Sequence, residues 1–455
     1  MENLMEKIVS LTKRRGFVFP SSEIYGGFAN SYSYGPYGAE LKKNIKDLWW
    51  KKVVQNRADM VGLDGPILLN PKLWEASGHT EGFNDAMVDC KECKKRYRAD
   101  HLVEKATGKD LEGQLEEMTK VLKEEKVKCP DCGKSNWTDA RNMNMMFKTQ
   151  MNGFDGGDVY LRPETAGAIF IEFKNIIDSM RVKVPFGIAQ IGKAFRNEIV
   201  AGNFIFRLRE FEQMEIEYFV DPEFKWEKMF EEWLEFQEEF AADLGAKKED
   251  LRRYEHPKEK LSHYSKKTVD IEYKFPFGFS ELFGLAHRGD FDLKSHSDAS
   301  GQKLEYFDAQ NNRRFTPHIL EPTFGLDRSI LVTLVSAYTE EKLEDGSERV
   351  VMKFPKKLAP VKCAIFPLLK NKPELVGKAR ELYDALKSQF MCEFDDNGNI
   401  GKRYRRQDEI GTPYCVTVDF DTLEDDTVTV RDRDTMEQQR IKIEELEGFL
   451  KDNLK

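Results

Sequence analysis

A basic loop between two β-type runs, FGIAQIG (186–192) and FEQMEIEYFV (211–220), constrains the fold more than any other feature of this sequence. Alternate residues of a strand lie on one face of a sheet. A strand that starts at Arg207 therefore has a face made of Arg207, Arg209, Phe211, Gln213, Glu215 and Glu217. Cations, a ring and carboxylates follow one another, which suits a ligand with phosphates, a flat ring and an ammonium group. Arg196 and Glu198 share a face on the preceding run. The alternative interpretation is a solvated, charged sheet face.

Further β-type runs recur through residues 140–330, interrupted by one helical block at 223–245. An amphipathic helix is expected at 39–55, because Leu41, Ile45 and Trp49 recur at helical spacing. This mixture predicts an α+β fold in which an antiparallel sheet is flanked by helices. We assign it to a first domain, residues 1–345.

The pattern changes towards the C-terminus. A charged segment that ends in prolines, 346–360, is typical of a linker. Strand-type and helix-type segments then alternate over 361–455, which predicts a separate α/β domain. Its densest basic run is Lys402, Arg403, Tyr404, Arg405 and Arg406. Such a run can contact phosphates and stack on an unpaired base. A solvated charge run is the alternative.

Four of the seven cysteines form two CxxC pairs, Cys90 with Cys93 and Cys129 with Cys132. Four thiolates at this spacing predict one tetrahedral, structural zinc site. We expect residues 88–138 to form an inserted zinc-ribbon-like module that carries a helix. The alternative is four reduced cysteines without metal. Disulfides are not expected in a chain with an ample core, so the cysteines indicate a reducing cytosol.

Charge and hydropathy exclude several classes of protein. The chain has 71 Lys and Arg against 80 Asp and Glu, which gives a net charge of -9. Any contact with nucleic acid must therefore come from a local basic patch. No apolar run is long enough for a membrane span, and the charged N-terminal stretch is not typical of a secretory signal. We expect a cytoplasmic protein.

Three further segments carry candidate functional residues. In PHILEPTFGLDRSIL (317–331), a strand leads into a helix with Arg328 near its start, where a phosphate can bind. Glu164 lies at a strand-to-helix turn, and Glu281 could hold a metal or a ribose hydroxyl. His287 has no triad partner, and we interpret it as structural. No phosphate-binding loop of the GK[ST] type is evident.

These motifs together resemble a known family. RNE followed by FRLREFEQMEIEYF is similar to motif 2 of class II aminoacyl-tRNA synthetases, EPTFGLDR is similar to motif 3, and 39–55 followed by DGPIL is similar to motif 1. SYSYGPYGAELKKNIKD, WEASGHTEGFNDAMVDCKECKKRYRAD and RPETA resemble glycyl-tRNA synthetases of the homodimeric type. Residues 361–455 resemble the anticodon-binding domain of class IIa synthetases.

The resemblance implies an ATP-dependent attachment of glycine to tRNA(Gly) through a glycyl-adenylate, by a homodimer. Arg196 and Arg328 would be catalytic, Glu198 and Phe211 would hold adenine, and Glu281 would help to hold Mg²⁺. The rest of the ATP site would be Asn197, Phe206, Arg207, Leu208, Arg209, Glu210, Leu282, Gly325, Leu326 and Asp327. The glycine site would be Arg98, Glu164, Phe211, Glu212, Gln213, Met214, Glu215, Glu321, Pro322, Thr323, Phe324 and Gly325. The basic run 402–406 would bind tRNA.

Two positions depart from the family pattern, since Thr323 stands where serine is common and Gly167 where glutamine is common. Two rival functions remain open at this point. One is a class IIa synthetase for another small amino acid, and the other is a non-catalytic, synthetase-like RNA-binding protein. Arg196, Arg207 and Arg328 are all present, which favours an enzyme.

Overall fold

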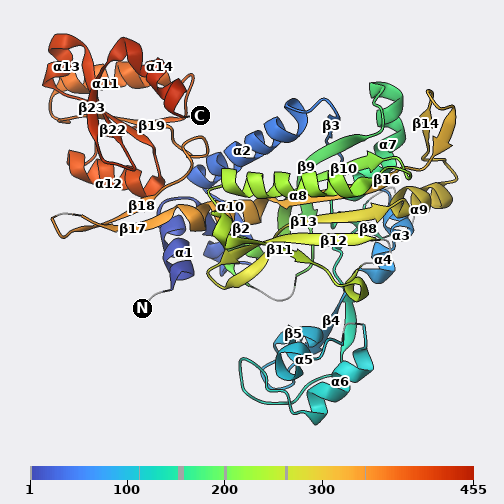
Figure 1. The fold of residues 1–455 in the computed structure, drawn as a ribbon. Helices are drawn as coiled ribbons and strands as arrows, with labels where there is room; N and C mark the ends of the chain where they lie inside the picture. The colour runs from blue at the N-terminus through green and yellow to red at the C-terminus, as the bar shows by residue number, and fades with distance from the viewer. Residues whose placement is uncertain are drawn as a thin grey trace.

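A seven-stranded sheet forms the centre of the protein (Figure 1). The computed structural model describes residues 3–111, 113–151, 158–198, 202–261, 265–343 and 345–454. In spatial order the strands are β11 (Leu251–Glu255), β12 (Lys267–Phe275), β13 (Gly278–Gly289), β16 (His318–Gly325), β10 (Glu210–Val220), β9 (Phe186–Phe195) and β3 (Met60–Leu63). All neighbours are antiparallel except β3 and β9. The predicted α+β fold is confirmed.

Helices cover both faces of this sheet. One face packs on α1 (Leu4–Arg14), α2 (Pro36–Trp50), α8 (Trp226–Asp243) and α10 (Leu326–Ala337), and the other on α7 (Ala166–Met180) and α9 (Phe291–Ser300). Apolar side chains of strand β10 pack on both of these helical layers. Its Met214, Ile216 and Tyr218 belong to the first layer, whereas Phe219 belongs to the second. The face that carries Gln213, Glu215 and Glu217 is therefore the one covered by α7 and α9.

The helix expected at 39–55 is α2, which continues as a π-helical turn, η2 (Lys51–Gln55). The remaining elements of this domain are short. They are β1 (Val18–Pro20), η1 (Glu23–Tyr25), β2 (Tyr32–Tyr34), α3 (Pro71–Ala76), α4 (His79–Gly82), β7 (Lys148–Thr149), β8 (Val159–Tyr160), η3 (Phe204–Phe206), η4 (Lys248–Asp250), η5 (Lys258–Lys260), β14 (Tyr306–Asp308) and β15 (Arg313–Phe315).

The cysteine-bearing insert projects from the main body (Figure 1). Its sheet has the order β5 (Arg96–Arg98), β4 (Asn84–Asp89), β6 (Arg141–Asn144), so the module extends beyond the predicted 88–138. It carries two helices rather than one, α5 (Ala99–Thr107) and α6 (Leu115–Glu124). Val103, Met118, Leu122 and Trp137 form its own small core.

Residues 338–352 form an antiparallel hairpin, β17 (Tyr338–Lys342) with β18 (Glu348–Met352). The prediction of a linker at 346–360 is therefore corrected. Val351, Met352, Phe354 and Leu358 are buried, because apolar residues alternate with charged ones within this segment. The high content of charged residues indicated a solvated linker, although part of the segment forms strand β18.

The C-terminal domain is an α/β unit, as predicted. Its sheet has the order β20 (Cys392–Phe394), β19 (Cys363–Pro367), β21 (Tyr414–Val418), β22 (Thr427–Asp432), β23 (Gln438–Lys442), and its helices are α11 (Pro373–Leu386), α12 (Ile400–Ile410), α13 (Phe420–Asp425) and α14 (Ile443–Asn453). The basic run lies on α12, which the sequence did not predict. None of the helices in the described parts of the chain has the length and apolarity to cross a membrane.

Candidate active site

A pocket of about 610 Å³ opens on the face of the sheet that β10, β13 and β16 share. Eighteen of the residues expected to bind ATP or glycine line it. They are Arg98, Glu164, Arg196, Glu198, Phe206, Arg207, Leu208, Phe211, Glu212, Gln213, Glu215, Glu281, Leu282, Glu321, Thr323, Gly325, Asp327 and Arg328. Segments more than 200 residues apart in the chain thus meet in one cavity.

Seven expected residues do not line the pocket: Asn197, Arg209, Glu210, Met214, Pro322, Phe324 and Leu326. Met214 and Phe324 are buried in the core on the opposite side of their strands, and Leu326 is buried in the same core at the start of α10. The predicted strand face also began too early, since β10 starts at Glu210. Arg209 lies before the strand, and its guanidinium is 5.1 Å from the Phe28 ring. Its neighbour Glu210 forms a surface ion pair with Lys193.

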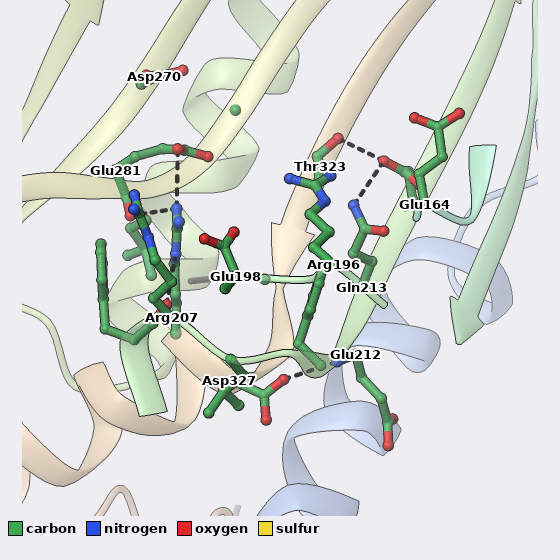
Figure 2. A pocket seen from close by; sticks show the side chains of 18 of the residues that line it. Glu164, Arg196, Glu198, Arg207, Glu212, Gln213, Asp270, Glu281, Thr323 and Asp327 are labelled. Carbon is green, nitrogen blue, oxygen red and sulfur yellow. Dashed lines mark hydrogen bonds and ion pairs between the residues drawn. The ribbon is translucent and has the colours of Figure 1, made fainter. Parts of the chain in front are cut away.

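Arg196 lies in the middle of the pocket, between its two ends (Figure 2). Its guanidinium carbon is 5.3 Å from the ring centres of both Phe83 and Phe211, and its Nε donates to the Pro163 carbonyl at 3.1 Å. Two rings and a hydrogen bond therefore fix its position. A cation held in this way can neutralise an anion in the pocket without reorganising.

Asp270 and Glu281 lie on one side of the pocket (Figure 2). Arg328 Nη1 is 3.0 Å from Glu281 Oε2, and His256 Nε2 is 2.8 Å from Asp270 Oδ2. Each of these two ion pairs therefore involves one oxygen of the carboxylate and leaves the second oxygen outside the pair. Those second oxygens, Oδ1 and Oε1, both lie within 4.0 Å of the point that a Cβ of Gly284 would occupy. Glycine at this position keeps the space between the two oxygens open.

The pKa values of these two carboxyl groups are shifted in opposite directions. Arg328 lowers the pKa of Glu281, although burial opposes it. Burial, together with the charge of Glu281, raises the pKa of Asp270 to about 6. A cation between the two free oxygens would favour the ionised form of both groups.

The opposite end of the pocket holds three carboxylates. Glu215 accepts hydrogen bonds from the Thr165 amide at 3.2 Å, the Thr323 hydroxyl at 3.2 Å and Gln213 Nε2 at 3.3 Å. Glu164 lies 3.3 Å from His79 Nε2. Glu321 Oε1 accepts from Arg288 Nη1 at 2.8 Å. These contacts hold the carboxylates in place around a small space.

Burial opposes ionisation of these groups, but their partners differ. His79, Arg288 and Arg196 overcome the effect of burial and lower the pKa of Glu164 to about 2. Burial and the nearby charge of Glu164 raise the pKa of Glu215. A small ammonium group placed between them would relieve their repulsion.

The sequence did not single out several lining residues: Phe83, Asn84, Asp85, Met145, Ile205, Thr268, Asp270, Gly284, Leu285, Ala286 and Arg288. Two of them carry a signal that was available. Asp270 stands between the buried Val269 and Ile271, and Arg288 is a buried charge at the end of β13. A charged residue next to buried apolar residues indicates a functional or paired site when it is itself buried, as Arg288 is. His287, in contrast, is fully buried and packs against Trp226, as a structural residue does.

The four cysteines of the insert come together as the sequence predicted. Cys90 Sγ lies 3.6 Å from Cys132 Sγ, and Cys93 Sγ lies 3.7 Å from Cys129 Sγ. All four sulfur atoms lie within 4.8 Å of one another. A zinc ion bound at about 2.3 Å by four thiolates requires neighbouring sulfur atoms about 3.8 Å apart. The spacing therefore fits a tetrahedral metal site.

The basic run of the C-terminal domain does not form one surface. Arg403 is 1% exposed and donates to the carbonyls of Asp396 at 3.0 Å and Gly398 at 2.9 Å. Tyr404 is packed against Phe366, and its hydroxyl bonds to Thr417. These two residues point inwards because α12 packs on the sheet, so the prediction that the whole run faces RNA is corrected. Lys402 is exposed, whereas Arg405 and Arg406 are partly exposed.

Comparisons with known proteins agree with this geometry. Residues 147–337 match the tRNA synthetase class II core domain (G, H, P, S and T), and residues 362–453 match the anticodon binding domain. The chain is 53% identical to the glycine–tRNA ligase of Clostridium acetobutylicum over 100% of this chain and 99% of that relative. It is also 53% identical to the glycine–tRNA ligase of Geobacillus thermodenitrificans, over 99% of this chain and 97% of that relative. The chain therefore belongs to the glycine–tRNA ligase family of class II aminoacyl-tRNA synthetases.

Proposed function

We propose that the pocket binds ATP and glycine side by side, joins them as glycyl-adenylate, and passes the glycyl group to tRNA(Gly). The observation that supports this most strongly is the division of the pocket into two ends, one with two arginines that can face phosphates and one with three carboxylates that can face an ammonium group. Arg207 lies at one end, near Glu281 and Asp270 (Figure 2), and Arg328 pairs with Glu281 there. Glu164, Glu215 and Glu321 lie at the other end. Arg196 lies between them, where the carboxylate of glycine would meet the α-phosphate.

The reaction needs positioning and charge neutralisation. A carboxylate oxygen of glycine attacks the α-phosphorus, and pyrophosphate leaves with the electrons of the broken P–O bond. The two reacting groups, the carboxylate of glycine and the phosphates of ATP, are both anionic, so the guanidinium groups of Arg196, Arg207 and Arg328 lower their repulsion. Glu164 and Glu215 would hold the ammonium group, and Thr323 would cover the position of a β-carbon. No side chain has to form a covalent bond.

Asp270 and Glu281 are the groups that would hold Mg²⁺. Magnesium prefers oxygen ligands and commonly uses one or two carboxylates together with substrate phosphates. The two free oxygens beside Gly284 fit this requirement. When bound, Mg²⁺ neutralises charge on the phosphates.

Cys90, Cys93, Cys129 and Cys132 would hold a structural Zn²⁺, because four thiolates leave no open position for catalysis. The insert also supplies Arg98 to the pocket, where it pairs with Asp85 at 3.0 Å. A metal that fixes the insert would therefore also fix one wall of the pocket.

The division of labour follows the domains. We assign activation to residues 1–345, including the insert, and recognition of tRNA to 361–455, joined through 346–360. Lys402, Arg405 and Arg406 are the residues of the basic run that remain accessible to RNA. We also propose a cytosolic homodimer, which rests on the motif 1 resemblance and on the reduced cysteines.

ATP–pyrophosphate exchange with glycine tests the assignment of the pocket. Arg196→Ala should lower the exchange rate by about 10²–10³-fold, because a fixed charge is lost from the transition state. Arg252→Ala is the matched control, since Arg252 pairs with Glu272 on the surface. Near-normal exchange in Arg196→Ala would show that ATP binds elsewhere. Exchange with another small amino acid but not with glycine would refute the substrate.

A further inference from the structure

Glu217 is a fully buried carboxylic acid for which the proposed reaction has no use. It lies on β10, two residues beyond Glu215 on the same face, with an exposed fraction of 0%. Neither of its oxygens accepts a hydrogen bond from a donor group in the described parts of the chain. An ionised carboxylate in such a place is strongly disfavoured, because burial removes its hydration and no donor replaces it. Its charge state therefore requires an explanation.

The sheet register sets Glu217 opposite a second carboxylic acid. Glu215 pairs with Thr323 and Tyr218 pairs with Leu320 across β10 and β16. The same register places Glu217 across from Glu321. One oxygen from each of Glu215, Glu217 and Glu321 lies within 4.8 Å of the other two. Like charges directly opposite each other on neighbouring strands are destabilising, and burial strengthens the repulsion.

The surrounding cations are too few for these acids. The charged groups that face Glu217 are Glu215 on its own strand, Glu321 on β16, Arg288 on β13 and Asp292 on α9. Arg288 donates Nη1 to Glu321, and its Nε and Nη2 donate to the two oxygens of Asp292 at 2.8 Å. One guanidinium therefore serves two other carboxylates before Glu217.

We propose that Glu217 and Glu321 share one proton at neutral pH, as a neutral carboxyl facing a carboxylate, and that Glu217 is thereby a positioning residue for Glu321 in the glycine site. Two carboxyl groups that face each other cannot both ionise at little cost, and a shared proton removes the repulsion. The role of Glu321 towards glycine rests on the proposed function, whereas the shared proton does not.

Burial and the neighbouring acids agree with this arrangement. Burial raises the pKa of Glu217 well above its usual range, and burial also raises the pKa of Glu321, although Arg288 opposes it. Because Arg288 donates a hydrogen bond to Glu321, it favours Glu321 as the ionised member of the pair. The proton would hold Glu321 against the floor of the pocket without adding a further negative charge. At neutral pH the ammonium group of glycine would then meet Glu321 in a fixed position. At alkaline pH both carboxyl groups would be ionised, and their mutual repulsion would displace Glu321.

Infrared difference spectroscopy of the whole protein tests the shared proton directly. The spectrum of the wild type minus that of Glu217→Gln, at pH 7, should contain the C=O stretching band of a protonated carboxylic acid. The band should disappear as the pH of the wild type is raised to 10. Glu210→Gln is the matched control, since Glu210 lies exposed on the same strand. This variant retains the protonated carboxyl, so the spectrum of the wild type minus that of Glu210→Gln should lack the band.

Pyrophosphate exchange separates this proposal from the proposed function. Glu217→Gln replaces a neutral carboxyl by a neutral amide, so the KM for glycine at pH 7 should stay close to that of the wild type. At pH 9 the variant should have the lower KM. Glu321→Gln should raise the KM about tenfold or more, because a charged hydrogen-bond acceptor is lost.

The outcomes are distinct. If the band is absent at neutral pH, or if Glu217→Gln raises the KM as much as Glu321→Gln does, Glu217 is ionised and the shared proton is refuted. If the band is present but Glu321→Gln leaves the KM unchanged, the shared proton stands and the glycine site has been misplaced. The wild-type titration keeps the test valid even if a variant fails to fold.

Discussion

Arg349 Nη1 lies 3.3 Å from Asp408 Oδ2, and both side chains are 1% exposed. Arg349 belongs to the hairpin that follows the catalytic sheet, and Asp408 belongs to α12 of the C-terminal domain. Asp408 also accepts from Arg431 at 2.9 Å, and Arg349 donates to the Arg433 carbonyl at 3.0 Å. The two domains are therefore joined by a buried ionic network rather than by a solvated linker.

Replacing Arg349 with alanine should destabilise the junction between the domains. The change leaves Asp408 with Arg431 but removes the donor to Glu341 and to the Arg433 carbonyl. We expect the free energy of unfolding to fall by roughly 2–4 kcal/mol, below the full cost of stranding a buried charge. Urea denaturation measures this. Arg252→Ala, which breaks a surface ion pair, should change it by about 1 kcal/mol or less. Equal effects would show that the network is not stabilising.

The purified protein should contain about one zinc ion per chain, as four cysteine thiolates form one tetrahedral site. Elemental analysis after purification without chelators measures it. Cys129→Ser should abolish the zinc and increase hydrogen exchange in residues 84–144 while the C-terminal domain stays protected. Cys363→Ser, a buried cysteine of the C-terminal domain, should keep the zinc. A zinc-free wild type with a fully protected insert would contradict the prediction.

The residues of the basic run should separate into two classes. Lys402→Ala combined with Arg405→Ala should weaken tRNA charging about tenfold or more through lost phosphate contacts, while glycine activation is unchanged. Arg403→Ala should instead lower the free energy of unfolding by roughly 2–4 kcal/mol, because buried carbonyls lose their donor. Charging assays and urea denaturation distinguish the two. A stable Arg403→Ala variant with a specific defect in charging would place Arg403 at the RNA surface.

Thr323 should exclude larger amino acids from the glycine site. Its hydroxyl bonds to Glu215 at 3.2 Å, so the side chain is held in one orientation in the wall of the pocket. Thr323→Ala should admit alanine, with discrimination reduced by about 10–100-fold, since a methyl-sized space is worth 1–3 kcal/mol. Pyrophosphate exchange with alanine and with glycine gives the ratio. Thr333→Ala, a buried threonine of α10, controls for loss of stability. An unchanged ratio would place the selecting residue elsewhere.

Acid should destabilise the protein through Glu164. The pKa of Glu164 is lowered to about 2 in the folded protein by His79, Arg288 and Arg196. A lowered pKa stabilises the folded state above the unfolded pKa of about 4.5, and that stabilisation is lost as the pH falls towards 2. The contribution is roughly 3 kcal/mol. The difference in unfolding free energy between wild type and Glu164→Gln should therefore shrink from pH 6 to pH 3. A constant difference would contradict the lowered pKa.

The sequence alone determined the features that depend on neighbours along the chain. The alternation after Glu210 placed Phe211, Gln213 and Glu215 on one face of β10, and the paired spacing of the cysteines predicted their cluster. Residues close together in the sequence are sufficient for both predictions, because the period of a strand and the reach of a CxxC pair are fixed by local backbone geometry. The family motifs added the order of the domains.

Tertiary structure decided which faces meet. The position of β16 between β10 and β13 brings Glu321 opposite Glu217 and Arg288 beside both, and no periodicity predicts which strands are neighbours. It also buried Arg403, whose charge suggested a surface, and gave Asp408 two arginine partners from distant strands, Arg349 of β18 and Arg431 of β22. Charged side chains can be buried when distant segments supply their partners, so the fate of a charge is a property of the fold and not of the local sequence.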